Sequence, residues 1–212
     1  EIKKLFETIV FDTPKPTPYI REMLKIATME NDIVLDFFSG SATLASAIFE
    51  QNIADNGKRK FICVQLPEKV DENSEAFKSG YQNICEIGKE RIRRAGEKIK
   101  EENNATDLDI GFKVFKLDSS NLKKWNNTPT KDADEIAKRI QISLDYLEND
   151  RTDLDLVYEI MLKYGIDLTL PITKTANEKA YIVNGEEYKL LVCSQMNLKL
   201  EDIEEFANES VG

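Results

Sequence analysis

The stretch Val-Leu-Asp-Phe-Phe-Ser-Gly-Ser-Ala-Thr-Leu-Ala, residues 34–45, decides the fold class of this chain. Its apolar beginning predicts a strand that ends at the carboxylate of Asp36, and Gly40 predicts a turn in which the backbone approaches a ligand without a Cβ. Apolar residues at helical spacing then predict a helix over about 42–52. A strand, a small-residue turn and a helix in this order are typical of a nucleotide-sized site in a doubly wound α/β protein.

Two phosphate-binding motifs do not fit this stretch. A Walker loop is excluded because no Gly-Lys-Ser/Thr follows, and a dinucleotide fingerprint needs three glycines where this stretch has only Gly40. We therefore expect a ligand other than a pyrophosphate-containing nucleotide. The alternative is that Asp36 and Gly40 form an ordinary strand-helix turn in an α/β domain.

The flanking segments extend the α/β pattern. Residues 12–18 contain three prolines in five residues, which predict a stiff extended segment, and a helix follows with Thr17 as its cap and Pro18 in its first position. A second strand over 61–66 implies a right-handed crossover and parallel pairing with the first. A long helix over 80–102 carries a basic run that we interpret as a solvated face, and the alternation over 112–118 predicts a third strand.

The pattern of predicted helices and strands changes after a polar stretch at 119–131. Beyond it the pattern predicts an α+β region, with helices over 132–147 and 153–164, a hairpin through Asn184-Gly185 and an acidic helix over 199–208. The expected fold class is α/β: a partial doubly wound, Rossmann-like sheet in residues 1–125, followed by a smaller α+β part in residues 126–212.

Composition removes several classes of function. Histidine is absent, so Ser-His-Asp and Cys-His nucleophiles are excluded, and the three cysteines, far apart and odd in number, are expected to be reduced core residues. No apolar run approaches the 18 residues of a membrane span and no signal peptide is recognisable, so a cytoplasmic location is expected. Residues 1–100 hold 16 basic and 16 acidic side chains, against 13 and 23 in residues 101–212. The acidic second half is a poor candidate for holding nucleic acid; its surface is either solvated or meets a basic partner.

Several segments together resemble the β class of DNA amino-methyltransferases. They are Phe-Asp-Thr-Pro-Lys-Pro (11–16), Asp-Phe-Phe-Ser-Gly-Ser-Ala-Thr (36–43) and Phe-Ile-Cys-Val-Gln-Leu-Pro-Glu (61–68). More narrowly, the chain resembles the modification (Mod) subunit of type III restriction-modification systems, a likeness strengthened by residues 84–96 and 111–121. The resemblance implies a site-specific DNA adenine-N6 methyltransferase that uses S-adenosyl-L-methionine; adenine rather than cytosine rests on the narrower likeness alone.

The resemblance also implies a set of cofactor-binding residues. The Pro-rich segment would grip the methionine end of the cofactor, the turn after the first strand would lie under it, Gln65 would stand where the family usually has an acidic residue for the ribose, and Asp118 would lie near the adenine. The implied residues are Thr13, Pro14, Lys15, Asp36, Phe37, Phe38, Ser39, Gly40, Ser41, Gln65 and Asp118.

One family motif is missing from the sequence. The family catalyses through Asp/Asn-Pro-Pro-Tyr, which binds the target base, and no such tetrapeptide occurs in the 212 residues. We therefore expect a piece of a longer protein, with no catalytic residue of its own, an open apolar edge on the first strand, weak cofactor binding and no methyl transfer alone. The implied partners are DNA for the intact enzyme, the restriction (Res) subunit and a second modification subunit. The alternative is a non-catalytic module, centred on residues 130–212, that docks the Res subunit or mediates dimerisation of modification subunits.

Overall fold

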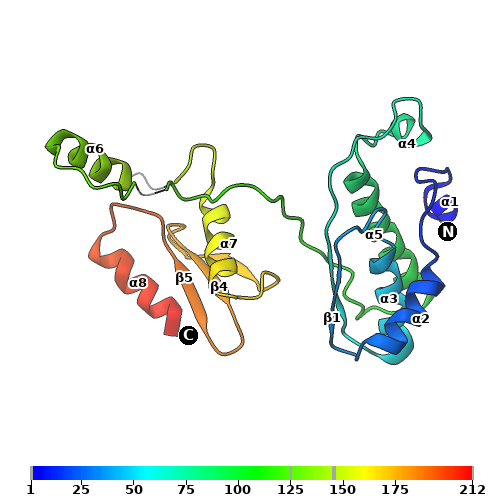
Figure 1. The fold of residues 1–212 in the computed structure, drawn as a ribbon. Helices are drawn as coiled ribbons and strands as arrows, with labels where there is room; N and C mark the ends of the chain where they lie inside the picture. Colours follow the sequence, from blue (N-terminus) through cyan, green and yellow to red (C-terminus); the bar gives the residue numbers. More distant parts are fainter. Residues whose placement is uncertain (1, 125, 145–146, 212) are drawn as a thin grey trace. The chain divides into compact units, whose positions relative to one another are not determined.

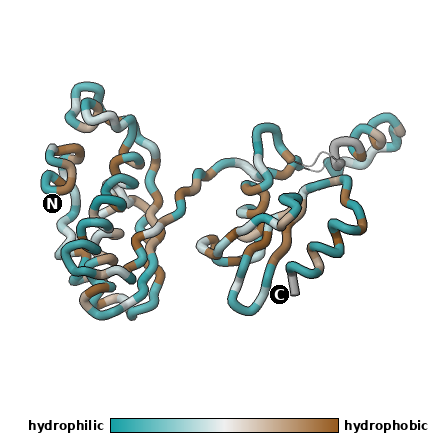
Figure 2. The backbone as a smooth tube through the Cα atoms, turned by 180° about the vertical axis from the view of Figure 1, so that it is seen from behind, coloured by the Kyte–Doolittle hydropathy of each residue, from teal (hydrophilic) through white to brown (hydrophobic). Residues whose placement is uncertain are grey.

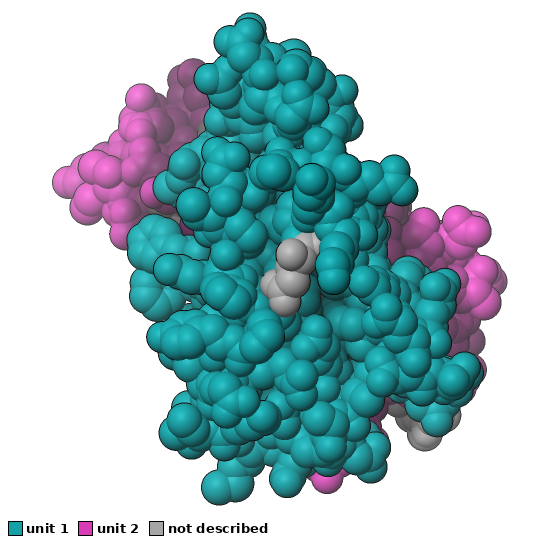
Figure 3. Space-filling model, turned by 90° about the vertical axis from the view of Figure 1, so that its right-hand side faces the viewer, with its two compact units in different colours: residues 1–112 teal, residues 113–212 magenta. Residues whose placement is uncertain are grey.

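The computed structural model describes residues 2–124, 126–144 and 147–211 (Figure 1). The chain divides into two compact units, residues 1–112 and 113–212, each with its own hydrophobic core (Figure 3). The division falls 13 residues before the end of the first predicted domain. Residue 125, where that domain was expected to end, and residues 145–146, near the end of the helix predicted over 132–147, lie outside the described residues.

The first unit is built on a parallel strand pair. Its elements are α1 (Ile2–Phe6), α2 (Thr17–Ala27), β1 (Ile33–Asp36), α3 (Thr43–Asp55), β2 (Lys60–Cys63), α4 (Glu75–Lys78) and α5 (Ile84–Glu102). Strand β1 pairs with β2, with Ile33 opposite Lys60 and Asp36 opposite Cys63. The predicted strand-helix-strand crossover with parallel pairing is therefore confirmed, and Figure 1 shows α3 and α5 on the same side of the strands.

The core of the first unit covers only one face of these strands. Val34, Phe61 and Cys63 pack against α3, which is buried along most of its length because Ala45 and Ala47 let its neighbours approach closely. On the opposite face Ile33 and Leu35 are 62% and 57% exposed, and Ile62 of β2 is 51% exposed. Parallel strands are normally covered on both faces, so this pair presents an uncovered apolar face.

A polar clasp fixes the chain between α3 and β2. The side chain of Asn52 donates to the carbonyl of Arg59 and accepts from its backbone N–H, both at 3.0 Å. The Arg59 side chain in turn donates to Thr28 Oγ1 at 2.8 Å and forms an ion pair with Asp55. These buried bonds hold α2, α3 and the start of β2 together.

The predicted third strand is absent: residues 112–118 form no strand, which corrects the expectation of three parallel strands in this part of the chain. Only Phe112 packs against the first core, beneath the guanidinium of Arg93. Lys113 and the residues after it belong to the second unit, where Phe115 packs edge-on against Tyr158. The first unit therefore ends before residues 113–118 could pair with its sheet, and Val114 and Leu117 are exposed.

The second unit is α+β. It contains α6 (Ala133–Leu144), α7 (Asp153–Lys163), β3 (Ile172–Lys174), β4 (Tyr181–Asn184), β5 (Lys189–Val192) and α8 (Leu200–Val211). The strands form an antiparallel sheet in the order β3-β4-β5, against which α7 packs through Val157 and Met161. Figure 2 shows hydrophobic residues along the strands of this sheet. The hairpin predicted through Asn184-Gly185 is confirmed, whereas β3 was not predicted.

Two local predictions in the first unit are wrong. Thr17 is not a cap: Pro16 occupies the cap position, and Thr17 is the buried first residue of α2. Helix α5 begins at Ile84, because the side chain of Asn83 accepts from the N–H of Glu86 and caps it there. Among the described residues, no helix is both long and apolar enough to cross a lipid bilayer.

Candidate functional site

The candidate site is the turn between β1 and α3, whose backbone is tied to β2. The N–H of Phe38 donates to Asp36 Oδ1 at 3.1 Å, and the N–H of Ser39 donates to the carbonyl of Val64 at 3.1 Å. The N–H of Val64 donates back to the carbonyl of Asp36 at 2.8 Å. The two strands therefore hold the turn at their carboxyl ends, the edge where open α/β sheets bind ligands.

The turn has an unusual backbone and close neighbours. Gly40 and Ala42 both lie in the left-handed region, with φ of 50° and 58°. A Cβ on Gly40 would lie 3.3 Å from Phe11 Cζ, and a Cβ on Gly88 of α5 would lie 3.3 Å from the Gly40 carbonyl oxygen. Helix α5 and Phe11 thus pack directly against the turn. A left-handed Ala costs about 1–2 kcal/mol, strain that persists only where the surroundings enforce it.

Gln65 joins the predicted site through a direct hydrogen bond. Its Oε1 atom accepts from the N–H of Gly40 at 2.8 Å, and its Nε2 atom donates to the carbonyl of Leu66 at 3.3 Å. The thiol of Cys85 lies 3.3 Å from the backbone oxygen of Gln65, to which it donates. The structure therefore brings together Gln65 and the turn, both of which the resemblance assigned to the cofactor site.

The Pro-rich segment lies between Phe11, which packs near the turn, and Thr17, which contacts Arg91 of α5. Thr13 and Lys15 are exposed and Pro14 is half-buried, in an extended stretch before α2. On one side of this stretch Phe11 packs near Gly40, and on the other the hydroxyl of Thr17 accepts from Arg91 at 3.5 Å. The segment is thus held near the turn by its ends, while Thr13 and Lys15 keep their side chains in solvent.

The aromatic pair in the turn faces outward. Phe37 and Phe38 are 64% and 77% exposed, and their ring centroids lie 5.3 Å apart. Aromatic rings at the mouth of a site offer flat apolar surface to a planar ligand group. Beside them Asp36 is half-buried and supplies a carboxylate, so the turn combines an anion, backbone N–H groups and aromatic surface.

Asp118 makes its contacts within the second unit. It lies in the second unit, where its carboxylate forms an ion pair with Arg151 at 3.0 Å and accepts from the N–H of Ser119. These contacts lower the pKa of Asp118, with Arg151 as the main cause. All other predicted residues belong to the first unit.

Arg91 was not predicted as a site residue. The basic run of the long helix was interpreted as a solvated face, but Arg91 is completely buried. Its guanidinium donates to Ser41 Oγ at 2.8 Å and to Thr43 Oγ1 at 2.7 Å. The signal was present: Arg91 follows Ile87 and precedes Ala95 by four residues each, which places it on the apolar stripe of α5.

Burial also shapes the chemistry beside the turn. It raises the pKa of the Cys63 thiol to about 12, aided by the negative charge of Asp36. Within the described parts of the chain, the three cysteines are free and no group of three His, Cys, Asp or Glu side chains is placed to hold a metal ion. The groups at the turn are suited to binding a small molecule.

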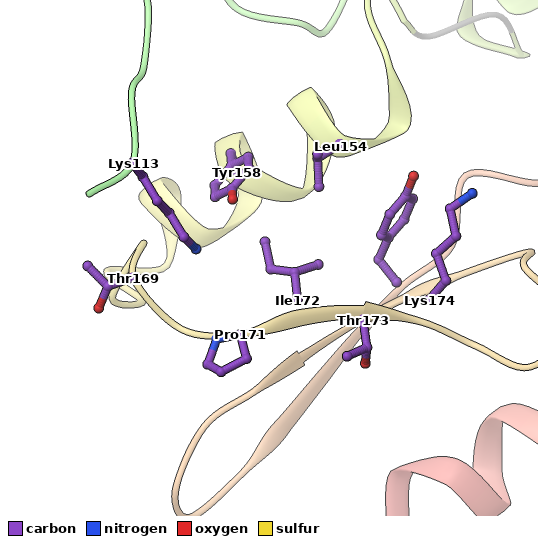
Figure 4. Close-up of a pocket in the computed structure, with 9 residues that line it drawn as sticks. Lys113, Leu154, Tyr158, Thr169, Pro171, Ile172, Thr173 and Lys174 are labelled. Atoms are coloured by element: carbon purple, nitrogen blue, oxygen red, sulfur yellow. The ribbon is translucent and has the colours of Figure 1, made fainter. Parts of the chain in front are cut away.

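A separate hollow of about 350 Å³ lies in the second unit between α7 and β3 (Figure 4). Lys113, Tyr158 and Ile172 line it. The Lys113 ammonium uses two of its three N–H donors on the carbonyls of Leu168 and Leu170 and lies over the Tyr158 ring, so it is held mainly by contacts within the protein. We therefore place the candidate site at the turn of the first unit.

A comparison with known protein families matches the part of the chain that contains this turn. Residues 3–76 match the sequence model of the DNA methylase family. The type III restriction-modification enzyme StyLTI Mod subunit of Salmonella typhimurium is 44% identical over 117 residues, which are 55% of this chain and 18% of that protein.

Two further relatives show the same partial coverage. The EcoPI Mod subunit of Escherichia phage P1 is 41% identical over 117 residues, 54% of this chain and 18% of that protein. The type II methyltransferase M.KpnI of Klebsiella pneumoniae is 37% identical over 92 residues, 43% of this chain and 22% of that protein. The matched part of this chain thus spans about a fifth of the length of these relatives.

Proposed function

About half of this chain is homologous to the Mod subunits of type III restriction-modification enzymes, and on that premise we propose that it is the S-adenosylmethionine-binding portion of a site-specific DNA adenine-N6 methyltransferase. The observation that carries the proposal is the turn at residues 36–41, tied to Gln65 at the carboxyl ends of two parallel strands. Residues 3–76, which match the DNA methylase family, include both the turn and Gln65.

The residues of the turn suit the parts of S-adenosylmethionine. In the proposed complex the Asp36 carboxylate attracts the amino group of the cofactor, and backbone N–H groups at the start of α3 receive its carboxylate. Phe37 and Phe38 supply apolar surface for the adenosine portion, and the Pro-rich segment closes over the methionine end. Bound there, the cofactor supplies an electrophilic methyl group.

Gln65 has two tasks in this proposal. Its side chain already holds the Gly40 N–H, and it stands where the family places an acidic residue for the ribose hydroxyls. A neutral amide forms weaker hydrogen bonds to a diol than a carboxylate does. We therefore assign Gln65 mainly to holding the turn, with a weaker contact to the ribose.

The sheet geometry supports a partial doubly wound fold. Strand β1 is paired on one side with β2, and one face of the pair is bare. In a complete doubly wound sheet, further strands would continue from β1 and helices would cover the second face. The proposed enzyme therefore needs additional chain to close the other wall of the cofactor site.

Catalysis is assigned to groups outside these residues. The family tetrapeptide Asp/Asn-Pro-Pro-Tyr does not occur in the sequence, so we assign to this chain cofactor binding and no step on the DNA base. We expect the chain alone to bind S-adenosylmethionine more weakly than micromolar, to hold DNA weakly and to transfer no methyl group.

A titration tests the proposal directly. The full 212-residue chain is titrated with S-adenosylmethionine while the amide resonances of residues 36–43 and 65 are followed by NMR, which detects millimolar affinity. Shifts confined to the turn and lost in Asp36→Asn are expected, with Asp32→Asn, in the exposed loop before β1, as the matched control. No shift at the turn, or equal effects of both substitutions, would refute the proposed site. Tritium transfer to DNA by the pure chain would refute the assignment of catalysis elsewhere.

We also propose that the second unit docks a partner, either the Res subunit or a second Mod subunit. The support is the acidic outer surface of α8, where Glu201 and Glu204 are exposed while Asp202 pairs inward with Lys179 at 2.6 Å. Capture of Res by the full chain, compared with a Glu201→Lys, Glu204→Lys variant, tests this. Charge reversal at Glu186 and Glu187, in the β4–β5 turn, is the control. Equal capture by all three proteins would rule out this surface for the Res subunit, and sedimentation of the same proteins tests dimerisation.

A further inference from the structure

The completely buried Arg91 is the unexpected feature of the first unit. A buried guanidinium is costly unless its N–H groups are satisfied. The guanidinium donates to hydroxyl groups on three different segments: Ser41 in the turn, Thr43 at the start of α3 and Thr17 at the start of α2.

These three acceptors lie where the segments of the candidate site meet. Thr17 follows the Pro-rich segment, and Ser41 and Thr43 flank Ala42, whose φ of 58° is strained. Arg91 itself lies on α5, whose Gly88 approaches the Gly40 carbonyl. One planar group therefore spans the contact between the turn and the helix that follows the Pro-rich segment.

We propose that Arg91 is a positioning residue that holds the turn and the Pro-rich segment in the arrangement that receives the amino-acid end of S-adenosylmethionine. This inference rests on the proposed function. Arg91 acts through Ser41, Thr43 and Thr17, and touches no reacting atom. A Lys ammonium keeps the charge but lacks the planar fork that serves several acceptors at fixed angles.

The first arm of the test needs no cofactor. Amide hydrogen exchange is measured in the full chain for the wild type, Arg91→Met and Arg91→Lys. Arg93→Met is the matched control, because Arg93 lies on the same helix with a 57% exposed side chain. We expect the amides of Gly40, Ala42 and Thr17 to exchange at least about tenfold faster in Arg91→Met, while β2 and the rest of α3 stay within about twofold. Arg91→Lys should give an intermediate effect.

The second arm uses two cofactor analogues in NMR titrations of the same variants. S-adenosylhomocysteine carries the amino-acid end, and 5′-methylthioadenosine lacks it. Arg91→Met should raise the dissociation constant of S-adenosylhomocysteine by about tenfold and that of 5′-methylthioadenosine by less than about threefold. A purely structural role would weaken both compounds alike.

Each result decides between the inference and the function on which it rests. Uniformly faster exchange, unchanged exchange, or equal effects of Arg93→Met would overturn the role of Arg91. If the wild type binds neither compound, the proposed function fails for this chain, while the exchange arm still decides the role of Arg91. If Arg91→Met does not fold, Arg91→Lys and Ser41→Ala carry the same comparison, and equal losses for both analogues would again overturn it.

Discussion

The amide oxygen of Gln65 accepts a hydrogen bond from the backbone N–H of Gly40 at 2.8 Å and so joins the end of β2 to the turn after β1. We expect Gln65→Leu to lower the free energy of unfolding by about 1–2 kcal/mol, because the Gly40 N–H loses its acceptor. Gln65→Glu keeps an acceptor and should stay within about 0.5 kcal/mol of the wild type at neutral pH. Urea denaturation followed by circular dichroism measures both. The exposed Gln82→Leu is the control, and equal losses in Gln65→Leu and Gln82→Leu would contradict the assigned role.

Adjacent residues of β1 should respond very differently to a charge. Leu35 is 57% exposed on the bare face, whereas Val34 packs against α3. Leu35→Lys should change the unfolding free energy by less than about 0.5 kcal/mol, and Val34→Lys should cost several kcal/mol because it buries a charge. Denaturant titration of both variants is the measurement. A large loss in Leu35→Lys would mean that the face is covered in solution.

Glu159 should make the second unit acid-sensitive in a defined window. Burial raises the pKa of its carboxyl, but hydrogen bonds from Lys163, Ser120 and the Asn121 N–H outweigh burial and bring the pKa down to about 2 from 4.5. The folded pKa lies below the unfolded one, so this stabilisation is complete above pH 4.5 and is lost as the pH falls to about 2.

The difference in urea midpoint between the wild type and Glu159→Gln isolates this contribution from other carboxyl groups. We expect the difference to be largest above pH 4.5 and to shrink towards zero near pH 2. The exposed Glu187→Gln is the matched control and should follow the wild type throughout. A difference that does not vary with pH would contradict the prediction.

The thiol of Cys63 should resist alkylation in the folded chain. Burial and the nearby Asp36 carboxylate raise its pKa to about 12, so little thiolate is present at pH 8. Iodoacetamide labelling read by peptide mass spectrometry should modify Cys63 only after unfolding in urea. Asp36→Asn removes the charge but not the burial, and should increase native labelling only slightly. Labelling at the same rate in native and unfolded protein would show that the site is open.

The sequence predicted the first unit best where local chemistry alone determines the structure. The apolar start of the stretch at 34–45, the glycine turn and the helical spacing after it are local signals, and β1, the turn and α3 follow them. The resemblance placed Gly40 and Gln65 in one cofactor site, but the hydrogen bond between them was not predicted, because the residues are 25 positions apart. Parallel pairing brought them together.

The failures have a common physical cause. Alternation over 112–118 indicates an extended chain but does not supply a neighbouring strand, and these residues pair with none. Arg91 was assigned by its charge and its basic neighbours, whereas its position on the apolar stripe of α5 determined its burial. Both outcomes depend on tertiary packing, which side-chain type alone does not reveal.

The clasp of Asn52 on Arg59 has a consequence for strand slippage. Strand β1 contains three consecutive apolar residues, Ile33, Val34 and Leu35. If the strand slid by one residue, the side chain facing α3 would therefore still be apolar. Hydrophobic burial therefore discriminates poorly between the two alignments, unlike in a strand with a polar face. Hydrogen bonds at fixed positions must therefore set the alignment. The two hydrogen bonds between the Asn52 side chain and the Arg59 backbone are of this kind and lie at the start of β2. A single amide side chain thus holds the start of β2 against α3, and parallel pairing then places Asp36 and Gln65 at the same end of the sheet.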